Sequence, residues 1–292
     1  MKVQTDCLAC ILNMTIGAMR RLGMDESGNA RELLGRIMAL PGYSNVDWSR
    51  TSPEVIEDVM REFYDFVGNP DPFVSIKDNM NRLAQGFVPR LTERIADSND
   101  PFETAARLSI LGNALDFMVP FSEKKFEEVI EAQMTMPLSN DAVSELKRRV
   151  TEAGLIVILG DNAGEIVFDR LFIMEMKKIT EADMVFVVRS QPVMNDATMD
   201  EAKRVGLDEV IRVIGNGIDG PVPGTILDRC SSEVRRLLMD ADLVISKGGG
   251  NFDSLHEDLD RTGPVTFMLL SKCRPYVTHL NTEIGRPIMA HF

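Results

Sequence analysis

The chain has 292 residues, of which 44% are hydrophobic and 26% charged, as in globular proteins that bury a sizeable core. Its formal net charge of −13 argues against nucleic acid as a partner, because that binding depends on neutralising phosphates with Lys and Arg. No apolar run reaches about 18 residues, which excludes a membrane-spanning helix and argues against a membrane as partner.

The amino-terminal segment, MKVQTDCLACILNM, contains a short apolar stretch that Asp6 and Asn13 interrupt. Because the segment lacks a clean cleavage site, we expect a first helix and not a signal peptide. Four cysteines in a chain of this length do not make a disulfide framework. We therefore expect a cytoplasmic protein.

The first half of the chain, residues 1–150, has the residue spacing of helices, and we expect no strand there. Asp6 is a suitable cap for the first helix. The sequence Ser-Pro-Glu from Ser52 is a favourable helix start, and two Asp-Pro pairs mark further starts. The expected helices cover residues 6–23 and 52–68, begin again at 71 with a bend at Pro89, and then cover 100–118, 122–134 and 140–152.

From residue 153 onward, apolar β-branched runs alternate with amphipathic helical stretches. This alternation predicts right-handed βαβ units and a mostly parallel sheet. The change in composition near residue 150 is the expected domain boundary. We expect strands at 155–159, 184–188, 210–214, 243–246 and 265–270, and helices at 163–178, 197–205 and 225–240.

Polar residues follow three of the expected strands. The first strand is followed by GDNAGE, which contains Asp161, Asn162 and Glu165. The second leads into SQPVMNDAT, which contains Asp196, and the third into KGGGNFD, which begins at Lys247. Ligands of open α/β sheets bind at the carboxyl ends of the strands, so we expect these side chains to lie together at a site.

The residue types at these strand ends indicate a metal and a phosphate. Two acidic groups and an amide at a buried strand end are costly unless a cation lies among them. Asp161, Asn162 and Asp196 offer the oxygen ligands of a hard divalent cation such as Mg²⁺ or Mn²⁺. The glycines after Lys247 leave backbone N–H groups free for phosphate, and Lys247 adds a point charge. Taken alone, Asp196 could be a helix cap and GGGN a flexible loop. The presence of all three polar segments at strand ends favours a functional site.

Cys7 and Cys10 are three residues apart and share a face of the first expected helix. We favour simple burial for them, ahead of a substrate-side or redox role. A structural zinc would need two further ligands, which only Cys230, Cys273, His256, His279 and His291 could supply.

The block VILGDNAGE, followed by NDAT and KGGGNFDSL, resembles the metal-dependent damage-control phosphatases, formerly catalogued as a domain of unknown function. The first half is similar too, in DCLAC near the amino terminus, in DPF with Lys77 and Asn81 beyond it, and in GNALDF from residue 112. The similarity spans essentially the whole chain, and DCLAC suggests the short microbial branch. It implies the fold class α/β, with an all-helical domain (1–150) packed on a Rossmann-like three-layer domain with a mostly parallel sheet (151–292).

The resemblance also implies phosphatase activity on small phosphorylated metabolites, with a divalent metal such as Mn²⁺, Mg²⁺, Co²⁺ or Ni²⁺. Asp161, Asn162 and Asp196 would be the metal ligands, and Asp161, Asp196 and Lys247 the catalytic residues. The substrate would be bound by Glu165, Asn113, Asp116, Gly248, Gly249, Gly250 and Asn251.

Two glycines stand out within these segments. Gly249 occupies a position where the family pattern predicts a larger polar residue. Gly112, beside Asn113, is poor helix chemistry and costs about 1 kcal/mol relative to Ala. Such a glycine suggests that another backbone or a ligand approaches closely, so we expect Asn113 and Asp116 to line a cleft opposite Asp161.

The main hypothesis is metal-assisted hydrolysis of a phosphate monoester, such as a sugar phosphate or a damaged metabolite, by an activated water or by Asp161 as nucleophile. S-adenosylmethionine-dependent methyl transfer is an alternative, but the carboxylates of the GDNAG turn would repel the carboxylate of that cofactor. A non-catalytic metabolite-binding protein is the third possibility. The sequence does not specify the oligomeric state.

Overall fold

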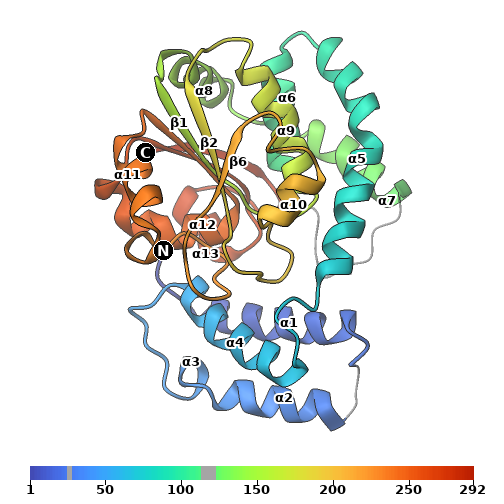
Figure 1. Ribbon diagram of the computed structural model, residues 1–292, viewed down its shortest axis with the longest axis vertical. Helices are drawn as coiled ribbons and strands as arrows, with labels where there is room; N and C mark the ends of the chain where they lie inside the picture. The colour runs from blue at the N-terminus through green and yellow to red at the C-terminus, as the bar shows by residue number, and fades with distance from the viewer. Residues whose placement is uncertain (25–27, 113–122) are drawn as a thin grey trace.

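The computed structural model describes residues 1–24, 28–112 and 123–292 (Figure 1). Its centre is a six-stranded sheet in the order β3-β2-β1-β4-β5-β6. All neighbouring strands are parallel except β6, which is antiparallel to β5. The expected α/β fold class is therefore confirmed. The strands are β1 (Leu155–Leu159), β2 (Asp183–Val188), β3 (Arg212–Gly215), β4 (Leu243–Lys247), β5 (Val265–Leu270) and β6 (Pro287–His291).

Two strand predictions need correction. β3 begins at Arg212, two residues later than expected, and β6 was not expected. β6 begins with a proline and has a single β-branched residue, Ile288, so it lacks the apolar β-branched run that identified the others. It lies at the edge of the sheet, where proline is tolerated.

Helices make up the described part of the chain before β1. They are α1 (Thr5–Arg21), α2 (Gly28–Ala39), α3 (Pro41–Ser44), α4 (Ser52–Val67), α5 (Val74–Ala96), α6 (Pro101–Gly112), α7 (Glu123–Met134) and α8 (Asn140–Glu152). After β1 the α-helices are α9 (Glu165–Met176), α10 (Met199–Arg204), α11 (Ser232–Asp240), α12 (Gly248–Leu255) and α13 (Arg274–Leu280). The sequence did not predict α2, α3 or α13.

The helix caps differ from the sequence predictions by one or two residues. The cap of α1 is Gln4, and Asp6 lies inside the first turn. The cap of α4 is Thr51, whose backbone N–H and hydroxyl both donate to Glu54 Oε2, at 2.6 and 2.9 Å. This capping box satisfies backbone groups that a Ser52 cap would have left for water.

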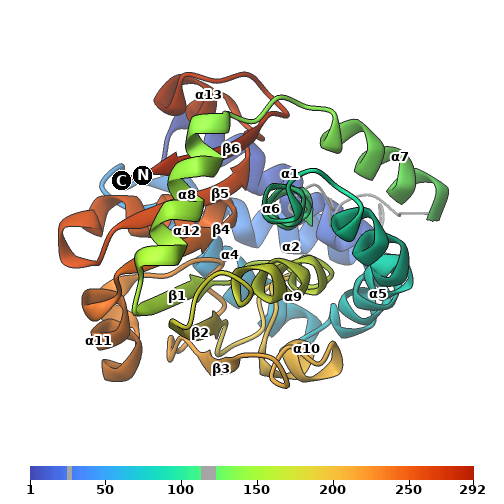
Figure 2. The ribbon, with the colours of Figure 1, turned by 90° about the horizontal axis from the view of Figure 1, so that it is seen from above.

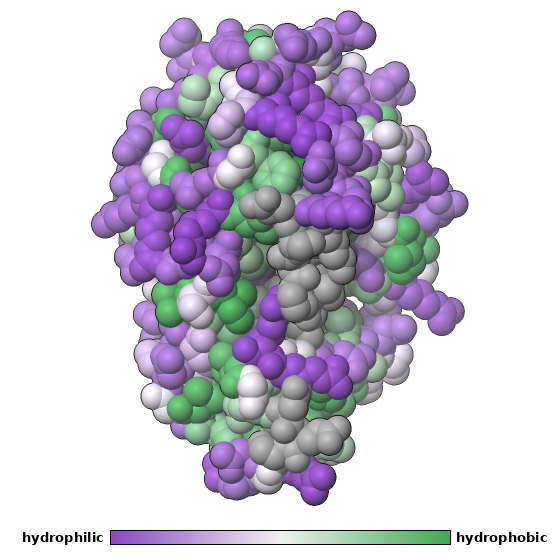
Figure 3. Space-filling view, turned by 90° about the vertical axis from the view of Figure 1, so that its right-hand side faces the viewer, coloured by the Kyte–Doolittle hydropathy of each residue, from purple (hydrophilic) through white to green (hydrophobic). Residues whose placement is uncertain are grey.

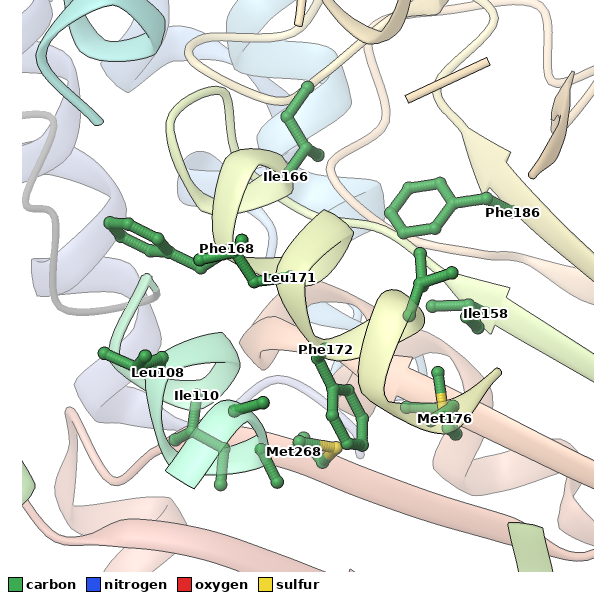
Figure 4. Close-up of a cluster of buried hydrophobic side chains, with 14 of the residues drawn as sticks. Leu108, Ile110, Ile158, Ile166, Phe168, Leu171, Phe172, Met176, Phe186 and Met268 are labelled. Atoms are coloured by element: carbon green, nitrogen blue, oxygen red, sulfur yellow. The ribbon is translucent and has the colours of Figure 1, made fainter. Parts of the chain in front are cut away.

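Helices cover both faces of the sheet. Alternate strand residues point to opposite faces, so Ile158 packs with α6 and α9, while Val157 and Leu159 pack with α11 and α12. Figure 2 shows α6 and α9 on one side of the sheet and α11 and α12 on the other. In Figure 4, Phe172 and Met176 of α9 lie in the cluster that joins this helix to α6 and to the strands.

The helices before β1 divide between two cores. Residues of α1, α2 and α4 form a cluster of their own, below the sheet in Figure 1, which Val193 and Met194 of the β2 loop join. Residues of α5, α6 and α8 instead share a core with the sheet. Helices on both sides of residue 150 thus pack together, and the domain boundary at 150 stays a prediction.

The molecular surface is mostly hydrophilic on the face shown in Figure 3, where apolar residues form small separate groups. Within the described ranges, no helix is both long and apolar enough to cross a membrane.

Candidate functional site

The strand order reverses between β1 and β4. From β1 the chain continues to β2 and β3 on one side, and then returns to β4 and β5 on the other. At such a switch point the loops that follow the strands diverge and leave a crevice, where open α/β sheets bind ligands. A cavity of about 270 Å³ lies here. Its lining includes residues after four strands: Asp161, Asn162, Asp196, Gly249, Gly250 and Lys272.

The loops after β1 and β2 are joined through their backbones. The Ala163 N–H donates to the Asn195 carbonyl and the Ala197 N–H to the Asp161 carbonyl, both at 2.8 Å. Asn81 on α5 accepts a hydrogen bond of 2.6 Å from the Gly164 N–H. The turn is therefore fixed from two directions, and Asn81 is one of the residues that fix it.

Arg189, directly after β2, connects the carboxylates of the two loops. It is buried, and it donates to Asp196 Oδ2 at 2.6 Å and to Asp161 Oδ1 at 3.4 Å. A third bond, of 2.8 Å, reaches Asn251 Oδ1, and the Asn251 amide donates to the carbonyls of Gly160 and Lys247. Asn251 is thus engaged within the protein, which favours a role in positioning over direct substrate contact.

Lys247 is fully buried behind the turn and is held on three sides. Its ammonium donates to Glu165 Oε1 and Asp169 Oδ1, each at 2.6 Å, and to the Ser109 carbonyl at 3.0 Å. Burial alone would lower the pKa of Lys247, but the two carboxylates outweigh it and raise the pKa. Burial raises the pKa of Asp169 to about 6, although Lys247 opposes the shift.

The three glycines of the loop are explained by close approaches. A Cβ at Gly248, whose φ is +77°, would lie 1.9 Å from Asp161 Oδ2. At Gly249 it would lie 2.5 Å from the Tyr276 hydroxyl, and at Gly250 1.7 Å from the Pro223 carbonyl oxygen. No larger residue fits at Gly249 without moving the tyrosine, which accounts for its departure from the family pattern.

Gly112 is explained in the same way, since its Cβ would lie 2.8 Å from the Glu165 Cα. The expected close approach of another backbone is confirmed, with α6 packing directly on α9. Asn113 and Asp116, which we expected beside it, lie outside the described residues.

Negative charge exceeds positive charge in the network around the turn. Burial raises the pKa of Asp161 well above its usual range, and Asp196 and Glu165 add to the shift. Burial also raises the pKa of Asp196, against the opposing effect of Arg189. Among the described residues, the hydrogen-bonded network contains four carboxylates and two cations. The carboxylates are those of Asp161, Glu165, Asp169 and Asp196, and the cations are Arg189 and Lys247.

The oxygen donors suit a divalent cation that is held by few protein ligands. Asp161, Asn162 and Asp196 line one cavity wall, with Asn162 Nδ2 2.7 Å from Asp161 Oδ2. Among the described residues, no group of three or more His, Cys, Asp or Glu side chains could form a metal cage. Mg²⁺-like ions are bound in a different manner, by one or two carboxylates together with waters and substrate phosphate. The excess of buried carboxylates over cations suits such an ion.

Two lysines, Lys272 and Lys77, add positive charge around the site. Lys272 follows β5 and lines the cavity without an ion pair to any residue that the structure describes. Its charge partly offsets the raised pKa of Asp161. Lys77, by contrast, is fully buried and bonds to Asp71 and Glu201, at 2.8 and 3.1 Å. Lys272 and Arg189 each follow a strand. That position could have identified both as site residues from the sequence, but neither was predicted.

Comparisons with known proteins identify the family of this chain. A family model described as the damage-control phosphatase ARMT1-like domain matches residues 3–288. A damage-control phosphatase from Pyrococcus horikoshii is 32% identical over 288 residues, which cover 98% of this chain and 96% of that protein. A damage-control phosphatase from Archaeoglobus fulgidus is 31% identical over 230 residues, or 78% of each chain.

The similarity extends to three dimensions. A crystal structure of a DUF89 family protein from Pyrococcus horikoshii superposes with a TM-score of 0.84 at 28% identity, covering 99% of this chain and 98% of that one. The family model spans nearly the whole chain, including all the strand ends that form the cavity. The chain therefore belongs to the damage-control phosphatases, a family of metal-dependent phosphatases, and is a phosphatase.

Proposed function

We propose that this phosphatase hydrolyses monoesters of small phosphorylated metabolites at the β1–β4 switch point, with a divalent cation held by Asp161, Asn162 and Asp196. The observation that carries the proposal is that these three residues line one cavity together with an excess of buried carboxylates. Bound there, a divalent cation supplies a Lewis acid that neutralises charge on the phosphoryl oxygens.

The chain's own residues position the reacting groups. Arg189 holds Asp161 and Asp196 at a fixed separation, and Asn251 holds Arg189. Gly249 and Gly250, in the first turn of α12, line the cavity. Because backbone N–H groups in the first turn of a helix have no partner within the helix, we assign theirs to phosphate oxygens. Asp161 accepts hydrogen bonds on both of its oxygens, which weakens it as a nucleophile, so we assign the attack to a water molecule.

The geometry favours Lys272 over Lys247 as the cation that meets the phosphate. Lys247 is fully buried and is already bound by two carboxylates. Lys272 lines the cavity and forms no ion pair with the described residues. An unpaired ammonium can bind an incoming anion without breaking an existing bond.

We expect Lys272→Ala to lower kcat/KM by about 10²-fold, the effect of removing one electrostatic stabiliser of a transition state. The melting temperature should stay unchanged, because the exposed Lys272 has no ion-pair partner among the described residues to lose. Lys203→Ala, which removes an exposed lysine of α10 that does not line the cavity, is the matched control. Equal kcat/KM in both variants would assign Lys272 to the solvated surface.

We also expect hydrolysis of a generic phosphate ester to stop after treatment with EDTA and to return when metal is added. Mg²⁺, Mn²⁺, Co²⁺ and Ni²⁺ should be compared on one batch of stripped protein, because carboxylate and amide oxygens accept all four. A panel of sugar phosphates and other small phosphate esters then identifies the substrate class. Full turnover in protein shown to be metal-free by elemental analysis contradicts the proposal.

Membership of a phosphatase family removes the reason for the methyltransferase and non-catalytic alternatives. The site agrees, since a buried excess of carboxylates disfavours a cofactor that carries a carboxylate of its own.

A further inference from the structure

Three cysteines that are far apart in the sequence meet at one wall of the active-site cavity. Cys7 and Cys10 belong to α1, and Cys273 directly follows Lys272. All three line the cavity that Asp161 and Asp196 also line, and all are free thiols. The fourth cysteine, Cys230, is buried in the core on the α11 side of the sheet and does not line the cavity.

The spacing of Cys7 and Cys10 suits a disulfide. Residues three apart on an α-helix have Cα atoms about 5 Å apart, which lies within the range that disulfides require. Both lie in the first two turns of α1, which begins with a capping box. Cys7 is part of that cap, because the Gln4 N–H donates to its sulfur at 3.4 Å.

The surroundings favour oxidation over metal binding. Within the described ranges, no group of three His, Cys, Asp or Glu side chains could hold a metal. Cys10 is exposed at the cavity, so a small oxidant can reach it, and Cys7 lies one helical turn away to resolve the product. Burial raises the pKa of both Cys10 and Cys7, so both thiols are mostly protonated at neutral pH and the reaction should quicken as the pH rises toward the thiol pKa.

We propose that Cys7 and Cys10 form a peroxide-sensitive site whose disulfide reshapes the cavity wall and lowers turnover. The Cys10 thiolate attacks hydrogen peroxide, so that an S–O bond forms, the O–O bond breaks and the departing hydroxide leaves as water. The Cys7 thiolate then attacks the Cys10 sulfur, an S–S bond forms, and the second oxygen leaves as water. Two thiols and one peroxide thus give one disulfide and two waters.

Bond formation should alter the first turn of α1. The sulfur of Cys7 must leave the Gln4 N–H to lie about 2.05 Å from the sulfur of Cys10. Ile11, on the same helix, also lines the cavity, so a change in this turn moves part of the cavity wall. The activity readout rests on the proposed function, whereas formation of the disulfide does not.

The experiment uses the full chain with Mg²⁺, which peroxide does not oxidise. After peroxide treatment, mass spectrometry of the unreduced peptides should show a Cys7–Cys10 disulfide, and the free thiols should fall from four to two. We expect kcat/KM to fall on the order of tenfold, as for a small misplacement of a reactive site. Dithiothreitol should restore both the number of free thiols and kcat/KM.

Variants separate this site from other thiols, each compared with its own untreated sample. Cys10→Ser should remove the reversible loss of activity, while Cys230→Ser should retain it. A bond from either cysteine to Cys273, or no disulfide at all, overturns the assignment. A Cys7–Cys10 disulfide with unchanged kcat/KM overturns the inhibitory role. If the untreated protein has no phosphatase activity, the proposed function fails, and the mass measurement still decides the oxidation site.

Discussion

Asp161→Asn should lower kcat/KM on the order of 10³-fold, since it removes a charged oxygen from the proposed cation site. Metal affinity measured by calorimetry should fall with it. The melting temperature of the metal-free variant should equal or exceed that of the wild type. Burial, with repulsion from Asp196 and Glu165, already holds the pKa of Asp161 well above its usual range, so its charge opposes folding when no cation is present.

Asp228→Asn is the matched control for this variant. Asp228 is an exposed carboxylate that pairs with Arg261 away from the cavity, and its loss should leave both turnover and metal affinity unchanged. Unaltered metal affinity in Asp161→Asn would show that Asp161 only shapes the turn. Reduced affinity together with a large loss of melting temperature would instead mean that the variant disturbs the fold.

Lys247→Met should lower the free energy of unfolding by about 3–5 kcal/mol, the cost of leaving buried charges without their partner. Lys247 is fully buried and forms ion pairs with Glu165 and Asp169, both also buried. Methionine fills a similar volume but cannot neutralise either carboxylate. Denaturant unfolding measures the loss, and Lys272→Met, which removes an unpaired lysine, should leave the midpoint nearly unchanged.

The pH dependence of Lys247→Met provides an independent check. Asp169 has a folded-state pKa raised to about 6, so its favourable contribution to folding is present at low pH and is lost as the pH rises through that value. Without Lys247 its pKa should rise further. The deficit in melting temperature should therefore be smaller at a pH of about 5 than at about 8, and adding Asp169→Asn should recover part of it. A deficit that is independent of pH would point to lost packing.

Local sequence signals were sufficient for the elements that carry the site. The run from Leu155 to Leu159, with Gly160 after it and a largely apolar segment from Glu165, specifies strand, turn and helix through residues close in the chain. Parallel strands end at a common edge, so the same reasoning placed Asp161, Asn162 and Asp196 near one another.

The partners of the charged residues could be read only from the tertiary structure. Lys247 ends one strand and Lys272 follows another, and no local sequence feature distinguishes them. Lys247 is nevertheless fully buried between two carboxylates, whereas Lys272 is exposed at the cavity. The difference arises because α9 carries Glu165 and Asp169 across the end of β4, a contact between segments about eighty residues apart.

The amino-terminal helices also show that a local pattern does not predict tertiary contacts. The spacing of Cys7 and Cys10 indicated a shared helix face but not what that face meets, since the position of α1 depends on its packing with α4 and the β2 loop. The sequence by itself determined the strands and helices that carry the site, and which polar groups stand at strand ends, because those depend on short-range periodicity. Which charges are paired, and which cysteines reach the cavity, depends on long-range packing that no local pattern encodes.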